Sequence, residues 1–383
     1  MNRPARILVC CVGTLIALGT VMIFSVLGAR GSSLAVGVHY LFKHLAWVAI
    51  AAGGFFVASR VDYRLLKRFV LPIALIVLLL LVMVLLPQFG THKFGARRWL
   101  RMGPIGFQPS EAAKPAMIIV LAAIFSSRWA KRPHGLIAAL GVVAFTSALV
   151  LAEKDFGTCA LLGMLGFMVI IAAGGAVLPT LGTAALGAGG LAFLLTRSPT
   201  RMARVFAFLD PWAHHDAAGY QALQSLTALG SGGLIGRVGM QKLFFLPQAE
   251  TDFIYAIIGE ELGLLGTLGV LAIFLVMVRQ GMRISEAAPD AFGRIAAFGI
   301  TAMIALQALM HIAVVTVSMP TKGIALPFVS SGGSALFMGL IGVGILVNIA
   351  QHCPAEAFAT EAVKRPRRSG GFMRRNVEVG AET

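Results

Sequence analysis

Apolar runs of about 20 residues recur along the whole chain, and they limit its fold more than any other feature. A helix of roughly 20 residues spans the hydrocarbon core of a bilayer, and backbone polar groups there must be paired inside a helix or a closed barrel. The runs are too long for the short alternating strands of a barrel. With 58% hydrophobic and 13% charged residues and a mean hydropathy of +0.85, the chain is predicted to be an all-α integral membrane protein.

Ten runs predict ten transmembrane helices, at residues 7–28, 41–59, 69–87, 112–126, 136–152, 157–173, 179–196, 253–278, 292–317 and 334–350. The first run follows Arg3 and Arg6 like a signal peptide, but it exceeds the roughly 7–15 residues of a cleavable apolar core, so we predict that it is retained. Gly and Ala dominate the seventh run, and a re-entrant segment there would invert every later loop.

The helices are predicted to form one membrane domain, residues 1–350, followed by a basic tail. A large extracytoplasmic loop, residues 197–252, separates the seventh and eighth helices. The tail, residues 351–383, is rich in Arg and poor in apolar residues, which predicts a disordered cytoplasmic segment.

Basic residues fix the orientation only weakly. With the amino terminus inside, 12 of the 32 Lys and Arg residues lie in cytoplasmic positions, six in the tail and 14 on the outer side. Basic residues resist translocation, yet the outer ones cluster in two loops, 93–114 and 197–242. We therefore predict that these loops bind an anionic ligand, with a phosphate group favoured. Contact with lipid head groups is the alternative.

Other classes of protein leave no trace in the sequence. The four cysteines lack the spacing of a disulfide framework or a zinc site, and the only paired histidines, His214 and His215, are adjacent and do not converge on one metal. We find no Walker loop and no dinucleotide fingerprint. The net charge of +16 could suit a nucleic acid, but no soluble domain is predicted that would present a binding surface, so we exclude nucleic acid.

Carboxylates at a membrane edge are costly and therefore candidates for function. Asp252, preceded by Thr251, is predicted to open the helix at 253–278, and Glu260 lies about two turns further along and on roughly the same face. The two are predicted to share a polar groove that enters from the outer side. The alternatives are a first-turn residue that interacts with the helix dipole for Asp252 and an interhelical hydrogen bond for Glu260. For Glu261 we favour such a bond.

The outer loop before residue 112 ends in a helix-start pattern, Pro109-Ser110-Glu111, followed by an apolar run. Ser110 is predicted to cap this helix, with Lys114 one turn inside it. Lys114 can pair with Glu111 at three residues' spacing, or it can bind a pyrophosphate. The sequence leaves both open.

Five motifs occur in one order along the chain: F-Q-P-S-E at 107–111, E-K-D-F-G-T at 153–158, F-L-D-P-W at 208–212, the segment from G-Y-Q to E-E-L-G at 219–263, and P-T-K-G-I-A-L-P-F-V-S-S-G-G-S at 320–334. In these motifs the chain resembles the SEDS family (shape, elongation, division and sporulation). It is more similar to the FtsW and SpoVE branch than to the RodA branch.

The resemblance implies a multi-pass glycosyltransferase of the bacterial cytoplasmic membrane, with both termini in the cytoplasm, that polymerises lipid II into glycan strands at the outer face during division or shape control. It implies a monofunctional class B penicillin-binding transpeptidase as partner, beside other division or elongation membrane proteins. No cofactor is firm, and a divalent cation is left open. Asp252 stands where the family's H-T-D-F-I-F motif has its aspartate, which implies that Asp252 is catalytic.

The chemistry of the residues agrees with this role. An acceptor hydroxyl must lose a proton as it attacks the anomeric carbon, and a carboxylate base contributes roughly 10²–10⁴-fold to such a step. Basic side chains can stabilise the departing pyrophosphate. The residues expected to bind substrate are Arg97, Arg98, Glu111, Lys114, Asp155, Arg201, Arg204, Gln224, Lys242, Lys322 and Ser330, and those expected to support them are Ser110, Trp212, Glu250 and Glu260.

The chain departs from the family pattern next to its aspartate, where Gln248-Ala249-Glu250 replaces the usual Glu-Ala-His. Lys154 also replaces a usual proline, His311 a usual asparagine and Ser331 a usual tyrosine. Two other functions therefore stay open: a flippase that carries lipid II across the bilayer, and a non-catalytic division scaffold.

Overall fold

The computed structural model of the protein describes residues 1–29, 34–93, 96–102, 105–128, 133–215, 219–237, 246, 248–354 and 358. The helices in these ranges are α1 (Arg3–Ala29), α2 (Leu34–Arg60), α3 (Arg64–Arg68), α4 (Val70–Leu85), α5 (Pro109–Phe125), α6 (Pro133–Ala152), α7 (Phe156–Ala172), α8 (Val177–Thr196), α9 (Pro199–Leu209), α10 (Tyr220–Ser231), α11 (Ile254–Ala287), α12 (Ala291–Val315) and α13 (Gly333–His352). The strands are β1 (Gly90–Lys93), β2 (Ala96–Met102) and β3 (Ile105–Phe107).

A helix coincides with each of the ten predicted apolar runs, namely α1, α2, α4 to α8 and α11 to α13. Seven of these helices are long and apolar enough to cross a membrane: α1, α2, α6, α8, α11, α12 and α13. The apolar helices α4 and α7 are shorter. A mostly helical, multi-pass membrane protein is therefore confirmed, and the count of ten crossings stays a prediction.

The loop after α4 folds into a small antiparallel sheet of order β1-β2-β3, in which Gly90 pairs with Leu100 and Leu100 pairs with Phe107. The prediction of an all-α chain is corrected at this point. The strands are short and rich in charge and Gly, so they lack the alternation of apolar and polar residues that marks a strand in a sequence. Helices α9 and α10 likewise occupy the predicted large loop.

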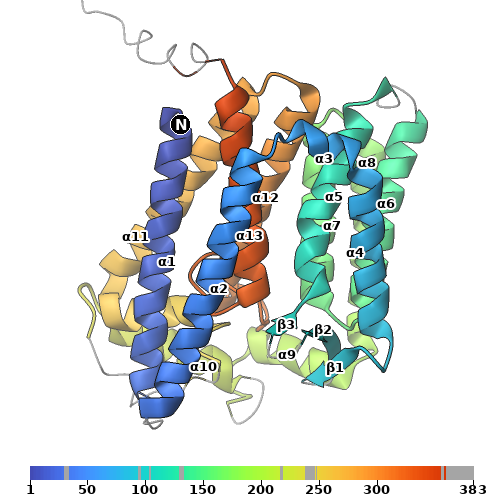
Figure 1. The fold of residues 1–383 in the computed structure, drawn as a ribbon. Coiled ribbons are helices and arrows are strands. Elements are labelled where there is room, and N and C mark those ends of the chain that lie inside the picture. Colours follow the sequence, from blue (N-terminus) through green and yellow to red (C-terminus); the bar gives the residue numbers. More distant parts are fainter. Residues whose placement is uncertain are drawn as a thin grey trace, which may run out of the picture.

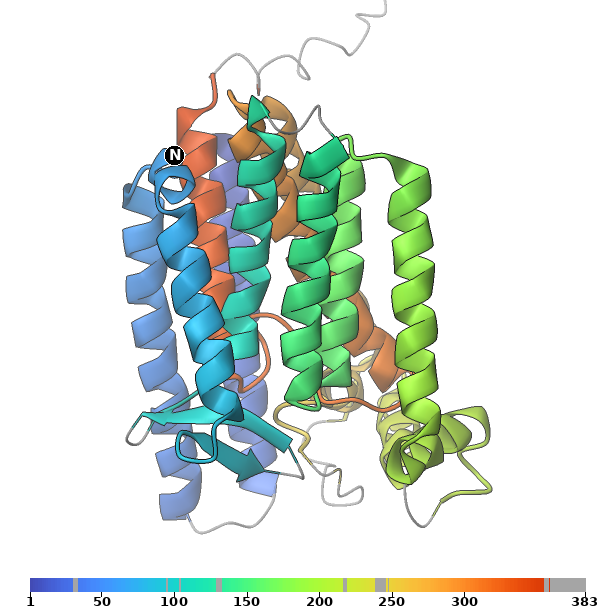
Figure 2. The same cartoon turned by 90° about the vertical axis from the view of Figure 1, so that its right-hand side faces the viewer.

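The small sheet, α9 and α10 lie at one end of the helix bundle, while the amino terminus and the end of α13 lie at the other (Figures 1 and 2). The two loops predicted to share the outer face therefore do lie together, opposite the amino terminus. Helix α12 lies inside the bundle: 72% of its most apolar 18 residues are buried, against 6% in α8. The polar side chains Thr301, Gln307 and His311 of α12 are buried in protein.

Helix α11 is broken at Gly263, where the backbone has φ +66° and ψ −162°. The backbone of the segment 232–237 fills this break. The N–H of Arg237 donates to the carbonyl of Glu260 at 2.9 Å, and the N–H of Leu264 donates to that of Gly233 at 2.9 Å. A Cβ on Gly263 would lie 2.5 Å from the nitrogen of Gly236, so only glycine permits this contact. The break thus ties the segment 232–237 to the helix that follows Asp252.

Candidate active site

Asp252 lies in a turn that precedes α11. The N–H groups of Thr251 and Asp252 donate to the carbonyl of Gln248 at 3.1 and 3.0 Å, and Gln248 adopts a positive φ of 56°. Because α11 begins at Ile254, helical periodicity does not relate Asp252 to Glu260. The prediction that they share a helix face is wrong; Glu260 is fully buried within α11.

The loop between α12 and α13, residues 316–332, holds this turn in place. The hydroxyl of Ser330 donates to the carbonyl of Thr251 at 2.7 Å and accepts from the N–H of Leu326 at 2.8 Å. The N–H of Ser331 donates to the carbonyl of Glu250 at 2.9 Å. Ser330 is 4% exposed, so these bonds give it a supporting role, and its predicted contact with substrate stays a prediction.

The same loop brings its own backbone against the carboxylate. A Cβ placed on Gly323 would lie 2.8 Å from Oδ2 of Asp252, which is closer than a side-chain carbon tolerates. The adjacent Lys322 extends to the start of α7, where a Cβ on Gly157 would lie 2.7 Å from its Nζ. Two glycines therefore leave the room that lets Asp252 and Lys322 occupy one region.

Asp155 caps α7 and is the acidic centre of this region. Its Oδ1 accepts from the N–H of Thr158 at 3.2 Å and its Oδ2 from the Thr158 hydroxyl at 3.0 Å. The Nε2 of Gln108 lies 3.5 Å from the same Oδ2. The side chain of Asp155 is 7% exposed. Asp155 thus fixes the amino terminus of α7 and draws basic groups toward it.

Arg98 in β2 is one of these basic groups. Its Nη1 lies 3.6 Å from Oδ2 of Asp155, and its Nη2 donates to the carbonyl of Lys154 at 2.7 Å. Arg98 lies at an irregularity in the pairing of β1 with β2, because Thr91 pairs with Trp99 and His92 pairs with Arg97. The extra residue in β2 disturbs the alternation of side chains at this point. Of the two predicted arginines, only Arg98 is brought to Asp155.

Two further arginines come from α9. The guanidinium of Arg201 lies 3.6 Å from the centre of the Phe156 ring, in a cation–π contact next to Asp155. Burial lowers the pKa of Arg201, and the neighbouring charges of Arg98 and Arg204 lower it further. Arg204 is itself exposed and acts on Asp252 through its charge. Strand β2, α7, α9, the 316–332 loop and the turn at Asp252 thus build one charged cluster.

The pKa values of Asp252 and Lys322 are both shifted toward 7. Asp252 keeps part of its surface exposed, but protein surrounds its carboxyl closely, and burial raises its pKa to about 6. The Thr251 hydrogen bond and the charges of Arg204 and Arg98 oppose this rise, and Glu250 adds to it. Burial lowers the pKa of Lys322 to about 8. At pH 7 most Asp252 carboxyls are ionised and able to accept a proton.

Glu153 belongs to this cluster and was not predicted. It is 1% exposed, and neither carboxyl oxygen has a hydrogen-bond partner in the described part of the chain. Burial, followed by the charge of Asp155, raises its pKa to about 8, against the effect of Arg98. The group is therefore mainly neutral at pH 7. Only its acidic type inside E-K-D-F-G-T could have pointed to it.

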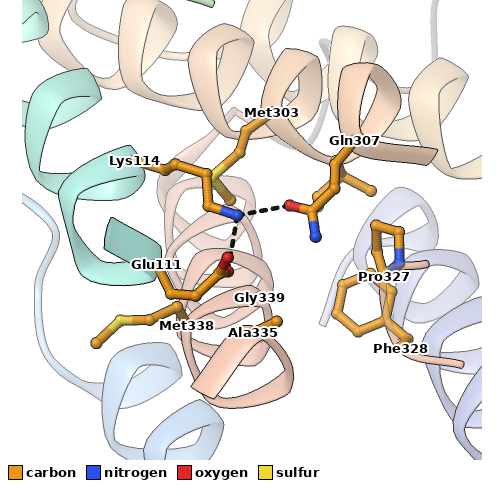
Figure 3. Close-up of a pocket in the computed structure, with 10 residues that line it drawn as sticks. Glu111, Lys114, Met303, Gln307, Pro327, Phe328, Ala335, Met338 and Gly339 are labelled. Carbon is orange, nitrogen blue, oxygen red and sulfur yellow. Dashed lines mark hydrogen bonds and ion pairs between the residues drawn. The ribbon is translucent and has the colours of Figure 1, made fainter. Parts of the chain in front are cut away.

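Lys114 and Glu111 form a second, buried group (Figure 3). Nζ of Lys114 lies 2.7 Å from Oε2 of Glu111 and donates to Oε1 of Gln307 at 2.8 Å. The small cavity beside them also touches Phe328 and Met338, and it holds about 10 Å³ for the centre of a water, roughly enough for one molecule. The structure thus shows the pairing of Lys114 with Glu111, and substrate binding by either residue stays a prediction.

Ser110 does not cap α5. Gln108 is the capping residue, Pro109 is the first helical residue, and the side chain of Gln108 makes no capping hydrogen bond. The hydroxyl of Ser110 instead accepts from Nε2 of Gln108 at 2.9 Å. Proline is favoured at the first helical position because it has no N–H to cap, and the helix therefore starts two residues earlier than the cap pattern predicts.

The remaining predicted residues either make no hydrogen bond or ion pair to Asp252 among the described residues or lie outside the described ranges. Trp212 is 75% exposed, so it does not pack against the site. Gln224 lies on α10, and its Oε1 is buried without a hydrogen-bond partner among the described residues. Both carboxyl oxygens of Glu260 are in the same situation, whereas Glu261 accepts a hydrogen bond from Ser25 of α1. Lys242 lies outside the described residues.

No group of three or more His, Cys, Asp or Glu side chains that could hold a metal ion occurs in the described ranges. The residues around Asp252 are mainly basic, which suits an anion better than a cation. The described residues around Asp252 therefore offer no set of ligands for the divalent cation that the sequence leaves open.

Residues 5–354 match the family model of the FtsW, RodA and SpoVE proteins, which is described as "Cell cycle protein". A probable peptidoglycan glycosyltransferase FtsW of Geobacter sp. (strain M18) is 38% identical over 338 residues, covering 86% of this chain and 92% of the relative. Stage V sporulation protein E of Bacillus subtilis is 34% identical over 366 residues, 92% of this chain and 98% of the relative.

Solved structures share the fold. A structure described as "Structural coordination of polymerization and crosslinking by a peptidoglycan synthase complex" aligns with a TM-score of 0.74 at 25% identity, covering 90% of this chain and 96% of the other. The crystal structure of the rod shape determining protein RodA of Thermus thermophilus aligns with a TM-score of 0.68 at 24% identity, covering 90% and 95%.

Proposed function

This chain belongs to the FtsW, RodA and SpoVE family of cell cycle proteins, and we propose that it is a peptidoglycan glycosyltransferase that polymerises lipid II into glycan strands. The observation that carries this proposal is the cluster at the sheet-bearing end of the bundle, where Asp252, with a pKa near 6, lies among Arg98, Arg204 and Lys322. Relatives named as peptidoglycan glycosyltransferases support the same activity.

In this mechanism Asp252 is the general base. It takes the proton of the acceptor sugar hydroxyl as the hydroxyl oxygen bonds to the anomeric carbon of the donor. The bond from that carbon to the lipid pyrophosphate breaks on the opposite side, so the anomeric centre inverts. The bond pair leaves with the pyrophosphate, and the proton stays on Asp252 until water removes it.

The basic side chains stabilise the leaving group. Negative charge grows on the pyrophosphate as its bond to the sugar breaks, and preorganised cations lower the energy of that state. Lys322 and Arg98 converge on Asp155 from two different elements, and Arg201 and Arg204 add charge from α9. We propose that these four side chains hold the pyrophosphate, with Gln224 and Lys242 as further contacts.

The rate should depend on pH through Asp252. Because the base must be ionised, kcat/KM is expected to rise between pH 5 and pH 7, with a midpoint near the pKa of about 6. The charge of Glu250 helps to raise that pKa, so Glu250→Gln should move the midpoint of this rise in kcat/KM to lower pH. Initial polymerisation rates over this range measure both. An unchanged midpoint in the Glu250→Gln variant would contradict the electrostatic effect of Glu250 on Asp252.

We further propose a location in the bacterial cytoplasmic membrane, with ten crossings, both termini in the cytoplasm and the 197–252 loop outside. Fusions of a compartment-sensitive reporter after Arg68 and near Arg374 should then report the cytoplasm, and one near His214 should report the outer side. The opposite pattern would place the Asp252 cluster on the wrong side of the membrane for polymerisation from outer-face lipid II.

A transpeptidase partner fits the same activity, because new glycan strands must be cross-linked. We propose a monofunctional class B penicillin-binding transpeptidase, together with other membrane proteins of division or elongation. The similar fold of the synthase complex supports an assembly of this kind. Removal of divalent cations with a chelator tests whether polymerisation requires one.

Polymerisation of purified lipid II tests the function against its two rivals. The purified protein with its transpeptidase partner should lengthen labelled lipid II into glycan strands. A flippase would move labelled lipid across vesicles without lengthening it, and a scaffold would do neither. Transport without polymerisation would overturn the proposal.

A further inference from the structure

Two polar side chains on the buried helix α12 bind the backbone of the 316–332 loop. Nε2 of Gln307 donates to the carbonyl of Ala325 at 3.0 Å, and Nδ1 of His311 lies 2.6 Å from the carbonyl of Ile324. They are four residues apart and hence on one face of the helix. Gln307 is 6% exposed and His311 is 0% exposed, so water does not compete for these bonds.

These contacts continue away from the loop to a fixed charge. Oε1 of Gln307 accepts from Lys114, which pairs with Glu111 (Figure 3). That bond fixes which end of the Gln307 amide faces Ala325, because only the nitrogen is left to donate. A carbonyl oxygen can only accept a hydrogen bond, so Nδ1 of His311 must carry the hydrogen and donate it. Each of these two bonds to the loop, which we call the tethers, therefore has a defined donor.

The tethered carbonyls directly follow the part of the loop that reaches the candidate site. Lys322 lies against Gly157, and the backbone of Gly323 lies against the Asp252 carboxylate. Past the tethers, Ser330 and Ser331 bind the turn that carries Asp252. The loop is thus fixed at both of its sides, by α12 on one and by the turn on the other.

We propose that Gln307 and His311 are positioning residues that hold the Ile324 and Ala325 carbonyls and so keep Lys322 and Gly323 in register with Asp155 and Asp252. They touch no reacting atom. This inference rests on the proposed function and deepens it, since it assigns the placement of the pyrophosphate-binding Lys322 to a helix face far from the substrate. The Glu111–Lys114 pair then acts through Gln307, by fixing its amide.

Four variants separate positioning from simple packing. Gln307→Glu keeps the shape and an acceptor for Lys114 but removes the donor to Ala325. His311→Leu removes the donor to Ile324, while His311→Asn keeps an N–H at nearly the same place. Thr301→Val is the matched control, because Thr301 is also buried on α12 but, among the described residues, its hydroxyl donates within its own helix to the carbonyl of Ala297, at 2.7 Å.

Hydrogen exchange on the purified proteins measures the protection of the loop independently of activity. Peptides that cover residues 320–332 should exchange faster in Gln307→Glu and His311→Leu, while those of α12 stay protected. His311→Asn and Thr301→Val should exchange like the parent. Unchanged protection of the loop in the first two variants would overturn the inference.

Polymerisation kinetics give the second readout. Gln307→Glu and His311→Leu should lose at least about tenfold in kcat with little change in KM, the pattern of an interaction made in the transition state. His311→Asn should recover most of the rate, and equal defects in His311→Asn and His311→Leu would also count against the inference. If the parent protein does not polymerise lipid II at all, the proposed function fails. The exchange experiment still shows whether Gln307 and His311 hold the loop in place.

Discussion

Asp252→Asn is expected to abolish polymerisation of lipid II while the protein still inserts in the membrane. The amide keeps the shape of the side chain but cannot accept the hydroxyl proton, and loss of a general base costs roughly 10²–10⁴-fold in rate. The fold should survive because the turn at Asp252 is held by the backbone of Gln248 and by Ser330. Rates on purified lipid II and thermal unfolding of the same preparation measure the two effects separately.

Glu250→Gln is the matched control for Asp252→Asn. Both changes replace a carboxylate by an amide in one turn, and Glu250 acts on Asp252 through its charge. Glu250→Gln should therefore keep most of the activity. A near-normal rate in Asp252→Asn would remove Asp252 as the base and direct the search to Asp155, Glu153 and Glu260.

The helices could be predicted from the sequence because their cause is local. A run of about 20 apolar residues has few other ways to satisfy its backbone in a bilayer, and each predicted run coincides with a helix. The sheet at 90–107 could not be predicted in this way, because its strands depend on pairing with one another. The break at Gly263 depends on the segment 232–237, which lies far from it along the chain.

The candidate site was partly predictable for the same reason. Ordered motifs pointed to Asp155, Lys322 and Asp252 singly, and the structure brings them into one cluster. Glu153 was missed because its importance comes from burial, which a lone acidic residue does not reveal. The tethers from Gln307 and His311 were missed because an amide or imidazole on an apolar helix gives no sign of its partner.

Arg98 and Arg97 separate a binding role from a merely basic surface. They are adjacent in β2, they are equally charged, and only Arg98 reaches Asp155 and the carbonyl of Lys154. Arg98→Ala should reduce kcat/KM by about 10²-fold or more, the range seen when a group that stabilises transition-state charge is removed. Arg97→Ala should change it by less than about threefold, as expected for a charge that does not contact Asp155.

The comparison holds the fold constant. Asp155 keeps both bonds from Thr158 when Arg98 is removed, so the cap of α7 should persist and both variants should unfold at similar temperatures. Salt screens charges that act over a distance more than charges in direct contact, so raising the ionic strength should reduce any effect of Arg97→Ala more than the effect of Arg98→Ala, whose side chain contacts the largely buried Asp155. Equal losses in the two variants would mean that the arginines act together as a basic surface for lipid head groups, and the pyrophosphate site would have to be built from Lys322, Arg201 and Arg204 alone.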